Sequence, residues 1–388
     1  MIGFDEALAL IAGVARPLGV ETVALAGASG RVLAAPVVAQ VDHPPGDVSA
    51  MDGYAVRSAD LPGRLPVAGE SLPGGSAASL PAGRCMRIFT GAPVPPGADR
   101  VVVQEEVARD GEVAVFGDAG PARFIRARGS DFAAGDVLLA PGRLLDPRAL
   151  VAAAGADLGE LEVWRRPRLA ILGTGDELAD PGTARATAGA IPDSATLGVA
   201  ALAVEWGGEL VVRTRLRDDL PALQQAAAEA LAAADLVVVT GGASVGERDF
   251  AKAMFEGLDL AFSKVAMKPG KPVWFGRAGD GLVIGLPGNP NSAMVTARLL
   301  LAPLLAGLSG RAPAEALRWC SAPLAEGLAA CGDRETFVRA RYEGEAVRAL
   351  PNQDSGAQKT LADADILIRC RPGAPAAAAG ERVEILEF

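Results

Sequence analysis

The apolar positions of residues 167–308 fall into two alternating kinds of segment, and their order predicts the fold of this region. Short, continuously apolar runs end in polar or glycine-rich turns, and longer stretches with helical spacing lie between them. Strands that are apolar at every position are typical of a parallel sheet covered on both faces. Their alternation with helices predicts a doubly wound α/β domain. The strand candidates are RLAILG, ELVVRTRL, DLVVVTGG and GLVIGLPGNP, and the helix candidates are ATLGVAALAVEW, LPALQQAAAEALAAA and NSAMVTARLLLAPLLAGL.

The rest of the chain has a different pattern. Residues 4–16 have helical spacing, whereas residues 42–135 hold short β-like runs between glycines and prolines, which predicts a compact β domain. Helical spacing returns at 146–160, and β-like runs return after residue 315. We therefore expect a multidomain α/β plus β protein. Its parts would be a helical elongated domain (1–41 plus 133–166), an inserted β-rich domain (42–132), a central doubly wound α/β domain (167–310) and a C-terminal β-barrel-like domain (311–388).

Composition narrows the class of function. The net charge of −10 over 388 residues argues against a broad nucleic-acid surface. No apolar run approaches the roughly 20 residues that span a bilayer, and MIGFDEALAL carries acid where a signal peptide carries base. The four cysteines form no C-x-x-C pair, and the single histidine, His43, excludes mechanisms that need two imidazoles. We expect a cytoplasmic protein without nucleic-acid or membrane partners.

Lysine is rare and clustered. Only five of the 37 basic residues are lysines, and Lys264, Lys268 and Lys271 lie within eight residues. An ammonium group is a compact point charge with three donors, whereas a guanidinium is a broad planar fork. The cluster therefore predicts a tight pocket for a small oxyanion or phosphate. For Lys271, inside PGKP, an exposed turn position is the alternative.

Acids and glycines follow the strand candidates, where ligands bind in open α/β sheets. Glycines allow backbone N–H groups to approach an anion, and carboxylates together with phosphate oxygens suit Mg²⁺. The combination predicts a phosphorylated ligand bound through a hard cation. G-x-x-x-x-G-K-[ST] is absent, and so is G-x-G-x-x-G after the first strand. The candidates are Asp176, Glu177, Asp218, Asp219, Gly241, Gly242, Ser244, Gly246, Asp249, Gly288, Asn289 and Ser292.

Each of these signals also has a simple structural explanation. An isolated TGG or PGNP is usually a turn, and Asp218 and Asp219 precede a helix candidate, so that capping accounts for at least one of them. Asp52, Thr90 and Asp131 in the predicted insert are explained equally well as turn residues. The joint placement of the acids and glycines at strand ends is what favours a site.

Six ordered motifs resemble the molybdopterin molybdenumtransferase family, the MoeA type, which also forms the C-terminal half of gephyrin. They are SAMDGYAV, FTGAPVPPGADRVV, GTGDEL, TGGASVG followed by Asp249, KVAMKPGKP and GLPGNP. The resemblance implies that the protein inserts molybdenum from molybdate into adenylylated molybdopterin with release of AMP, assisted by Mg²⁺ or another divalent cation. It also implies a homodimer whose active cleft lies between the α/β domain of one subunit and the inserted domain of the other.

The resemblance assigns roles to particular residues. Asp52, Thr90, Asp131, Lys264 and Lys268 become catalytic candidates, and Glu177, Asp218 and Asp249 become metal ligands. Lysines would neutralise the oxyanion and the phosphoanhydride as charge develops, and the acids would hold the bridging cation. The substrate-binding candidates are Gly241, Gly242, Ser244, Lys271, Gly288, Asn289 and Ser355.

The chain also departs from the family pattern. Val48 and Ala195 occupy positions where asparagine is usual, and Ser355 and Thr360 both compete for the serine of the last domain. Two other functions stay open. The central domain also resembles a molybdopterin adenylyltransferase, although a stand-alone enzyme of that type lacks the insert and the last domain. A non-enzymatic scaffold is the lower-ranked alternative.

Overall fold

The computed structural model describes residues 1–76, 78–241 and 250–388. Its central sheet has, among these residues, six strands in the order β16-β13-β17-β21-β20-β18. The first four are parallel, whereas β20 and β18 are antiparallel to their neighbours. The prediction of an all-parallel sheet is therefore wrong at this edge, because Gly279 and Asp280 join β20 to β21 by a turn too short for a crossover. The strands are β13 (Arg168–Thr174), β16 (Glu209–Leu216), β17 (Leu236–Thr240), β18 (Asp259–Phe262), β20 (Trp274–Ala278) and β21 (Gly281–Leu286).

Helices cover both faces of this sheet, as expected for a doubly wound domain. One apolar core joins alternate strand residues such as Ile171 and Val238 to α3 (Ala195–Glu205), α6 (Pro290–Thr296) and α7 (Ala302–Leu308). The other core joins the intervening residues to α4 (Leu220–Ala233) and α5 (Phe250–Ala253).

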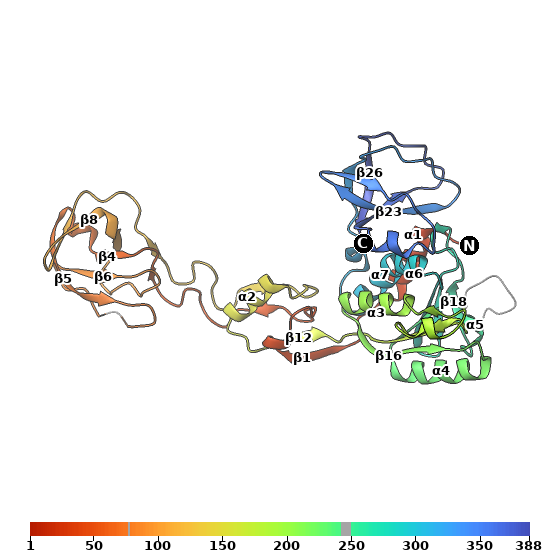
Figure 1. Ribbon diagram of the computed structural model, residues 1–388. Helices are drawn as coiled ribbons and strands as arrows, with labels where there is room; N and C mark the ends of the chain where they lie inside the picture. Colours follow the sequence, from red (N-terminus) through yellow and green to blue (C-terminus); the bar gives the residue numbers. More distant parts are fainter. Residues whose placement is uncertain (77, 242–249) are drawn as a thin grey trace.

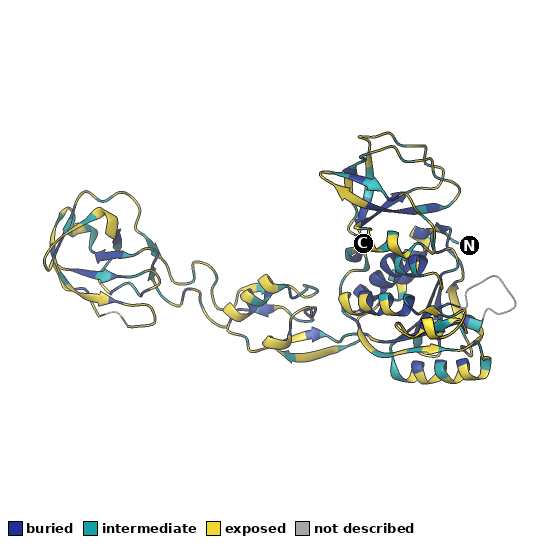
Figure 2. Cartoon of the chain, viewed as in Figure 1, coloured by how far each residue is buried: buried dark blue, intermediate teal, exposed yellow. Residues whose placement is uncertain are grey.

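A long apolar helix runs through the first of these cores. A π-helical turn, Ala297–Leu301, links α6 to α7. Within the described residues, the resulting stretch Pro290–Leu308 is long and apolar enough to cross a membrane, contrary to the expectation from the sequence. Its most apolar window is 94% buried inside the protein, and Figure 2 shows this helix enclosed by the rest of the domain. It is therefore a core helix of the fold.

Helix α1 (Phe4–Val14) differs in position from the sequence prediction. It was expected within the elongated domain, but its buried residues Phe4, Ala7 and Ile11 belong to the core around α7. Figure 1 shows α1 between the central sheet and the C-terminal strands. The apolar spacing predicted the helix but did not identify the surface it packs against.

The elongated region leads away from the central sheet (Figure 1). It pairs β1 (Val20–Ala24) with β12 (Glu160–Trp164), and β2 (Val37–Val38) with β11 (Val137–Leu139). Helix α2 (Pro147–Gly155) begins at Asp146, whose carboxylate accepts a hydrogen bond from the N–H of Ala149.

The inserted β region lies at the far end of this arm (Figure 1). The short pair β3 (Val48–Ser49) and β10 (Ile125–Arg126) precedes a sheet of order β7-β4-β6-β5-β9-β8. Two small apolar cores, one including Val56 and Phe116 and the other Ile88 and Val101, stabilise it. Its strands are β4 (Gly53–Val56), β5 (Gly63–Ser71), β6 (Cys85–Ile88), β7 (Arg100–Val103), β8 (Val107–Asp110) and β9 (Val113–Phe116).

The C-terminal sheet takes in a strand of the α/β region. Strand β19 (Met267–Lys268) pairs in parallel with β23, and the sheet has the order β19-β23-β25-β26-β22 with β24 beside β23. A bridge between Leu324 and Val347 brings the two ends of the curved sheet together. The other elements are β22 (Cys320–Pro323), β23 (Glu335–Glu343), β24 (Ala346–Ala349), β25 (Ile366–Cys370), β26 (Arg382–Glu387) and helix α8 (Gln358–Ala362).

Candidate functional site

A cavity of about 720 Å³ lies at the carboxyl ends of β13, β16, β17 and β21, and we call it the strand-end cavity. It contains six of the residues predicted from the sequence. Gly242, Ser244, Gly246 and Asp249 lie outside the described residues. The polar and glycine lining includes Thr174, Gly175, Glu177, Asp193, Ser194, Asp218, Gly241, Gly288, Asn289, Ser292 and Gln358.

Two glycines allow the backbone turns of this cavity to approach each other. Gly241 has a φ of +91°, and a Cβ there would lie 2.4 Å from the carbonyl oxygen of Thr174. A Cβ on Gly288 would lie 3.2 Å from the Cα of Gly241. Since a side chain at Gly241 would be both strained and too close, the glycine is required for the turn itself.

The acids of the cavity have different roles. Asp219 caps α4, its carboxylate accepting the N–H of Ala222 at 3.2 Å, so the capping explanation holds for this residue. Asp218 and Glu177 both line the cavity, and the N–H of Asp218 donates to Asp176 at 3.2 Å. Two carboxylates suit a hard cation, although the described residues include no group of three metal-binding side chains.

Asp193 and Ser194 also line the cavity, although neither was predicted as a site residue, because polar residues directly before a helix candidate are typical of N-caps. Asp193 is buried and accepts the N–H of Thr196 at 3.1 Å, with Arg213 3.9 Å away. The hydroxyl oxygen of Ser194 is buried and has no hydrogen-bond partner among the described residues. A buried, unsatisfied hydroxyl beside a cavity is available to a ligand.

The lysines lie on the loop 263–273, which we call the lysine loop. It precedes Trp274, the residue opposite Gly285, so the loop is at the same edge of the sheet as the strand-end cavity. Pro272 lines that cavity. Lys264 is half-buried, whereas Lys268 and Lys271 are exposed. The loop therefore reaches the predicted edge, but Lys268 lines a second cavity instead.

This second cavity, of about 340 Å³, lies against β23, and we call it the C-terminal cavity. Lys268, Arg334 and Arg339 contribute positive charge, and Asp333 contributes an acid. Arg339 is fully buried; its Nη2 donates to the carbonyl oxygen of Asp354 at 3.4 Å, while Nε and Nη1 have no partner within the described part of the chain. Burial lowers the pKa of the Arg339 guanidinium, and the charge of Asp354 opposes that shift.

Arg339 was not predicted as a site residue. It lies in the run RARYE, and the abundance of arginine in the chain gives no signal that one of them is buried. A buried cation whose N–H donors lack hydrogen-bond partners destabilises the folded protein unless an anion binds beside it.

The segment 353–358 contributes a residue to each of the two cavities. Gln353 lines the C-terminal cavity, and Gln358 lines the strand-end cavity. Between them, the hydroxyl of Ser355 accepts a hydrogen bond from the Asn289 side chain at 3.0 Å. The structure thus places Ser355 beside a strand-end residue, whereas its competitor Thr360 lies in α8.

The candidates of the insert form a separate group. The hydroxyl and N–H of Thr90 both donate to Asp52 at 2.8 Å, and these bonds, the backbone one first, lower the pKa of the Asp52 carboxyl. Asp131 lies on another loop, its N–H donating to His43 O at 3.0 Å. Figure 1 shows the insert far from the central sheet, so one chain does not bring these residues to the cavities.

These features define a class of protein: a doubly wound α/β domain with an acidic strand-end cavity, joined to a cationic C-terminal cavity. Three family models match successive parts of the chain, namely MoeA N-terminal region (domain I and II) at residues 2–156, probable molybdopterin binding domain at 170–307 and MoeA C-terminal region (domain IV) at 321–388. The chain belongs to the molybdopterin molybdenumtransferase family.

Individual relatives agree with this assignment. The molybdopterin molybdenumtransferase of Synechococcus elongatus is 35% identical over 97% of this chain and 96% of its own length. That of Haemophilus influenzae is 38% identical over 76% of this chain and 74% of its own. A crystal structure of the molybdopterin biosynthesis MoeA protein from Pyrococcus horikoshii OT3 has a TM-score of 0.86 at 26% identity, covering 100% of both chains.

Proposed function

We propose that this protein is a transferase of molybdenum cofactor biosynthesis, which inserts molybdenum from molybdate into adenylylated molybdopterin and releases AMP. The names of its relatives support the reaction class. The observation that carries the proposal is the buried Arg339: two of its guanidinium nitrogens have no hydrogen-bond partner among the described residues, and the residue lines a cavity that Lys268 also lines. Such a site suits a small dianion like molybdate.

The strand-end cavity would take the pterin and its phosphates. Donors to anionic oxygens come from the backbone turn at Gly241, from Asn289 and from the Ser194 hydroxyl, which has no partner in the part of the chain that the structure describes. The segment 353–358, which contributes to both cavities, would then hold the two substrates next to each other. Proximity of this kind is a large part of catalysis when two reactants must meet.

Mg²⁺ is the proposed cation. Glu177 and Asp218 line one cavity and fit part of a carboxylate donor set, with Asp249 as the third predicted ligand. When bound, the ion supplies positive charge to phosphate oxygens as the phosphoanhydride breaks. Lys264 and Lys271, on the same loop as Lys268, would add charge to this region without occupying the cation site.

We further propose a homodimer with a shared site. Asp52, Thr90 and Asp131 would come from the insert of a second subunit, since their own chain holds them far from the cavities (Figure 1). Exposed apolar side chains on α2 and α3 support an interface there: Val151 is 74% exposed, Leu197 51% and Val204 49%. The burial of helix Pro290–Leu308 is compatible with the proposed cytoplasmic location.

The test is an assay of AMP release from adenylylated molybdopterin with Mg²⁺, with and without molybdate. Release that requires molybdate, together with a molybdenum-containing product, supports insertion. Formation of adenylylated molybdopterin from ATP and molybdopterin would show an adenylyltransferase instead. If the protein consumes neither adenylylated molybdopterin nor ATP, the non-enzymatic scaffold is favoured.

A further inference from the structure

Residues 2–5 lie directly against the lysine loop, although more than 250 residues separate them in the sequence. The N–H of Ile2 donates to the carbonyl of Lys264 at 3.2 Å, and the N–H of Ala266 donates back to Ile2 at 2.8 Å. Ile2 and Val265 thereby form a parallel bridge between the positions of Lys264 and Lys268. The loop is thus held on one side by the beginning of the chain.

The C-terminal sheet holds the same stretch from the other side. The N–H of Glu335 donates to the carbonyl of Ala266 at 3.1 Å, and Lys268 pairs with Thr336 on β23. Arg339 lies three residues further along that strand and lines the same cavity as Lys268. The spacing of these two cations therefore depends on how the loop is seated against β23.

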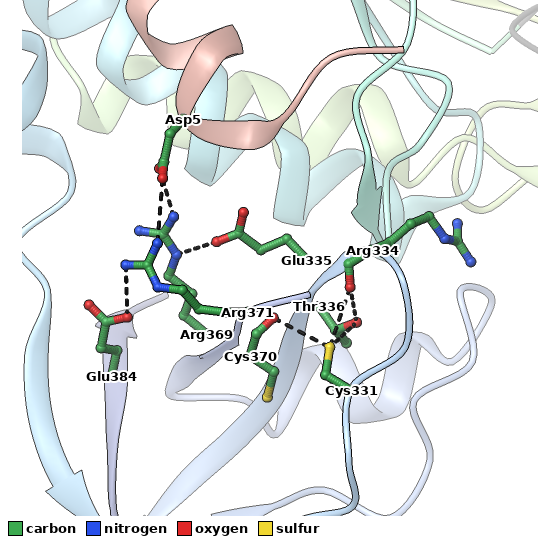
Figure 3. Close-up of polar contacts among 9 residues, drawn as sticks. All are labelled: Asp5, Cys331, Arg334, Glu335, Thr336, Arg369, Cys370, Arg371 and Glu384. Atoms are coloured by element: carbon green, nitrogen blue, oxygen red, sulfur yellow. Dashed lines mark hydrogen bonds and ion pairs between the residues drawn. The ribbon is translucent and has the colours of Figure 1, made fainter. Parts of the chain in front are cut away.

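Side chains connect the two holding elements, as Figure 3 shows. Arg369 donates to Asp5 of α1 at 2.6 Å and also pairs with Glu335 of β23. Its guanidinium lies over the rings of Phe4 and Trp319, 5.2 and 5.1 Å from their centroids. Burial lowers the pKa of Arg369, but the hydrogen bonds that its guanidinium donates to Glu335 and Asp5 outweigh that effect and raise the pKa overall.

The contact of Arg369 with Glu335 and Asp5 is expected mainly to fix the positions of these elements, and only secondarily to stabilise the fold. A buried ion pair often adds little net stability compared with apolar packing, but removing one partner disturbs a defined arrangement. Arg369 and Glu335 are 8% and 6% exposed, so that their arrangement is fixed by the surrounding packing. Asp5 extends it to α1 and also accepts Arg371 at 3.4 Å, while Arg371 reaches Glu384 at 3.1 Å.

We propose that residues 2–5, together with Arg369 and Glu335, form a clamp that positions the lysine loop so that Lys268 and Lys264 stand at the correct distance from Arg339. The proposal rests on the proposed function, since it assigns these cations to the oxyanion. The clamp residues are positioning residues: none of them lines either cavity among the described residues. They act through the backbone of the loop.

The informative variant is Asp5→Asn. Asp5 is on the surface, and removing its charge weakens the contact with Arg369 while the Arg369–Glu335 ion pair stays in place. The matched control is Glu6→Gln, which removes a neighbouring first-turn acid of the same helix and hence the same interaction with the helix dipole, while the glutamine amide oxygen can still accept the N–H of Gly3 as Glu6 does. We expect Asp5→Asn to raise the KM for molybdate roughly tenfold, in line with the sensitivity of catalysis to small displacements. The KM for adenylylated molybdopterin and the melting temperature should change little, and Glu6→Gln should leave all three unchanged.

A double-mutant cycle separates positioning from general structure. If Asp5 acts through Lys268, then Asp5→Asn should add almost nothing to the loss of activity caused by Lys268→Ala. The clamp would be overturned if the effects of the two substitutions on activity multiplied in the double variant. An unchanged KM for molybdate in Asp5→Asn would overturn it as well.

Hydrogen exchange tests the clamp without any turnover. Peptides covering 263–273 should exchange faster in Asp5→Asn than in the wild type or in Glu6→Gln, since the amides of Val265 and Ala266 would open more often. Equal exchange in all three proteins would overturn the proposal even if the enzyme is active. A wild-type protein without molybdate-dependent AMP release would contradict the proposed function, and faster exchange in Asp5→Asn would then still support the clamp.

Discussion

The α/β and C-terminal regions differ from the inserted β region in how they hold their candidate residues. In the first, side chains from distant parts of the chain meet around two cavities, which the segment 353–358 links. Some of their polar atoms, such as Arg339 Nε and Ser194 Oγ, lack partners among the described residues. In the insert, Asp52 and Thr90 satisfy each other on an exposed surface. Within the described residues, the first region thus keeps unsatisfied polar groups beside its cavities, whereas the second holds an exposed pair joined by its own hydrogen bonds.

This difference indicates how the two could cooperate. A cavity with unsatisfied buried donors needs a ligand but no further protein, whereas the exposed Asp52–Thr90 pair has no cavity of its own among the described residues. If both serve one reaction, a second subunit must bring the pair to the cavities.

The largest effect is expected from Arg339→Met. Removing the buried guanidinium should lower molybdate-dependent AMP release by about 10²- to 10³-fold, the range seen when a charge-stabilising donor is lost. The melting temperature should stay constant or rise, because an apolar side chain replaces a buried and incompletely paired charge. Enzyme assays and thermal unfolding would check both.

Arg341→Met is the matched control, since Arg341 lies on the same strand and is exposed. It should keep nearly full activity. A fall in the melting temperature that parallels the loss of activity in Arg339→Met would show that Arg339 only supports the fold.

Subunit complementation tests the shared site. Lys268→Ala and Asp52→Asn should each lower activity by about 10²-fold as pure homodimers, through loss of charge stabilisation and of a positioned carboxylate. If the two variants are co-expressed equally, about half of the dimers are mixed. In a C2 assembly each mixed dimer has one intact site of two, so about a quarter of the wild-type activity should return. Activity no higher than that of the parents would place both residues in one chain's site.

The sequence predicted the strand-end region well, because its signals are local. Continuous apolar runs predicted β13, β17 and β21, and the acids and glycines after them line one cavity. The antiparallel edge was missed because neither β18 nor β20 was among the strand candidates: their runs, DLAF and WFGRA, are short and contain polar residues or glycine. The domain bounds and the roles of the metal and catalytic candidates stay predictions.

Burial and long-range pairing explain what the sequence could not provide. In the sequence Arg339 looks like any arginine of a β-strand, and only the folded chain shows that it is buried and bonded to Gln353 and Asp354. The helical spacing of α1 does not reveal that Asp5 faces Arg369, because that contact joins residues 364 apart. Six family motifs gave the function class, whereas three-dimensional packing was needed for these partners.

A smaller effect, on stability, is expected when backbone strain is introduced at Gly241. Gly241→Ala should lower the free energy of unfolding by roughly 2–4 kcal/mol, since a Cβ adds a clash with Thr174 to an unfavourable left-handed conformation. Gly182 has the same φ of +91° but open space around it, so that Gly182→Ala should cost only about 1 kcal/mol. Denaturant unfolding measures both, and equal losses would show that the contact with Thr174 is unimportant.

The smallest effect concerns the pair in the insert. Thr90→Val removes the hydroxyl bond but keeps the backbone N–H, so the pKa of Asp52 should rise toward its ordinary value without reaching it. A lowered carboxyl pKa adds stability above the unfolded pKa and loses it as the pH falls through the folded one. The variant should therefore lose less stability on acidification than the wild type.

Carboxyl NMR titration would measure this shift, and a second pair in the same region provides the control. Asp99 accepts hydrogen bonds from the N–H and hydroxyl of Ser58, which likewise lower its pKa. Thr90→Val should move Asp52 and leave Asp99 unchanged, whereas Ser58→Ala should do the reverse. If instead the Asp52 titration changes when Lys268 of the α/β region is replaced, the two regions already meet without substrate, and the shared site is assembled in the resting dimer.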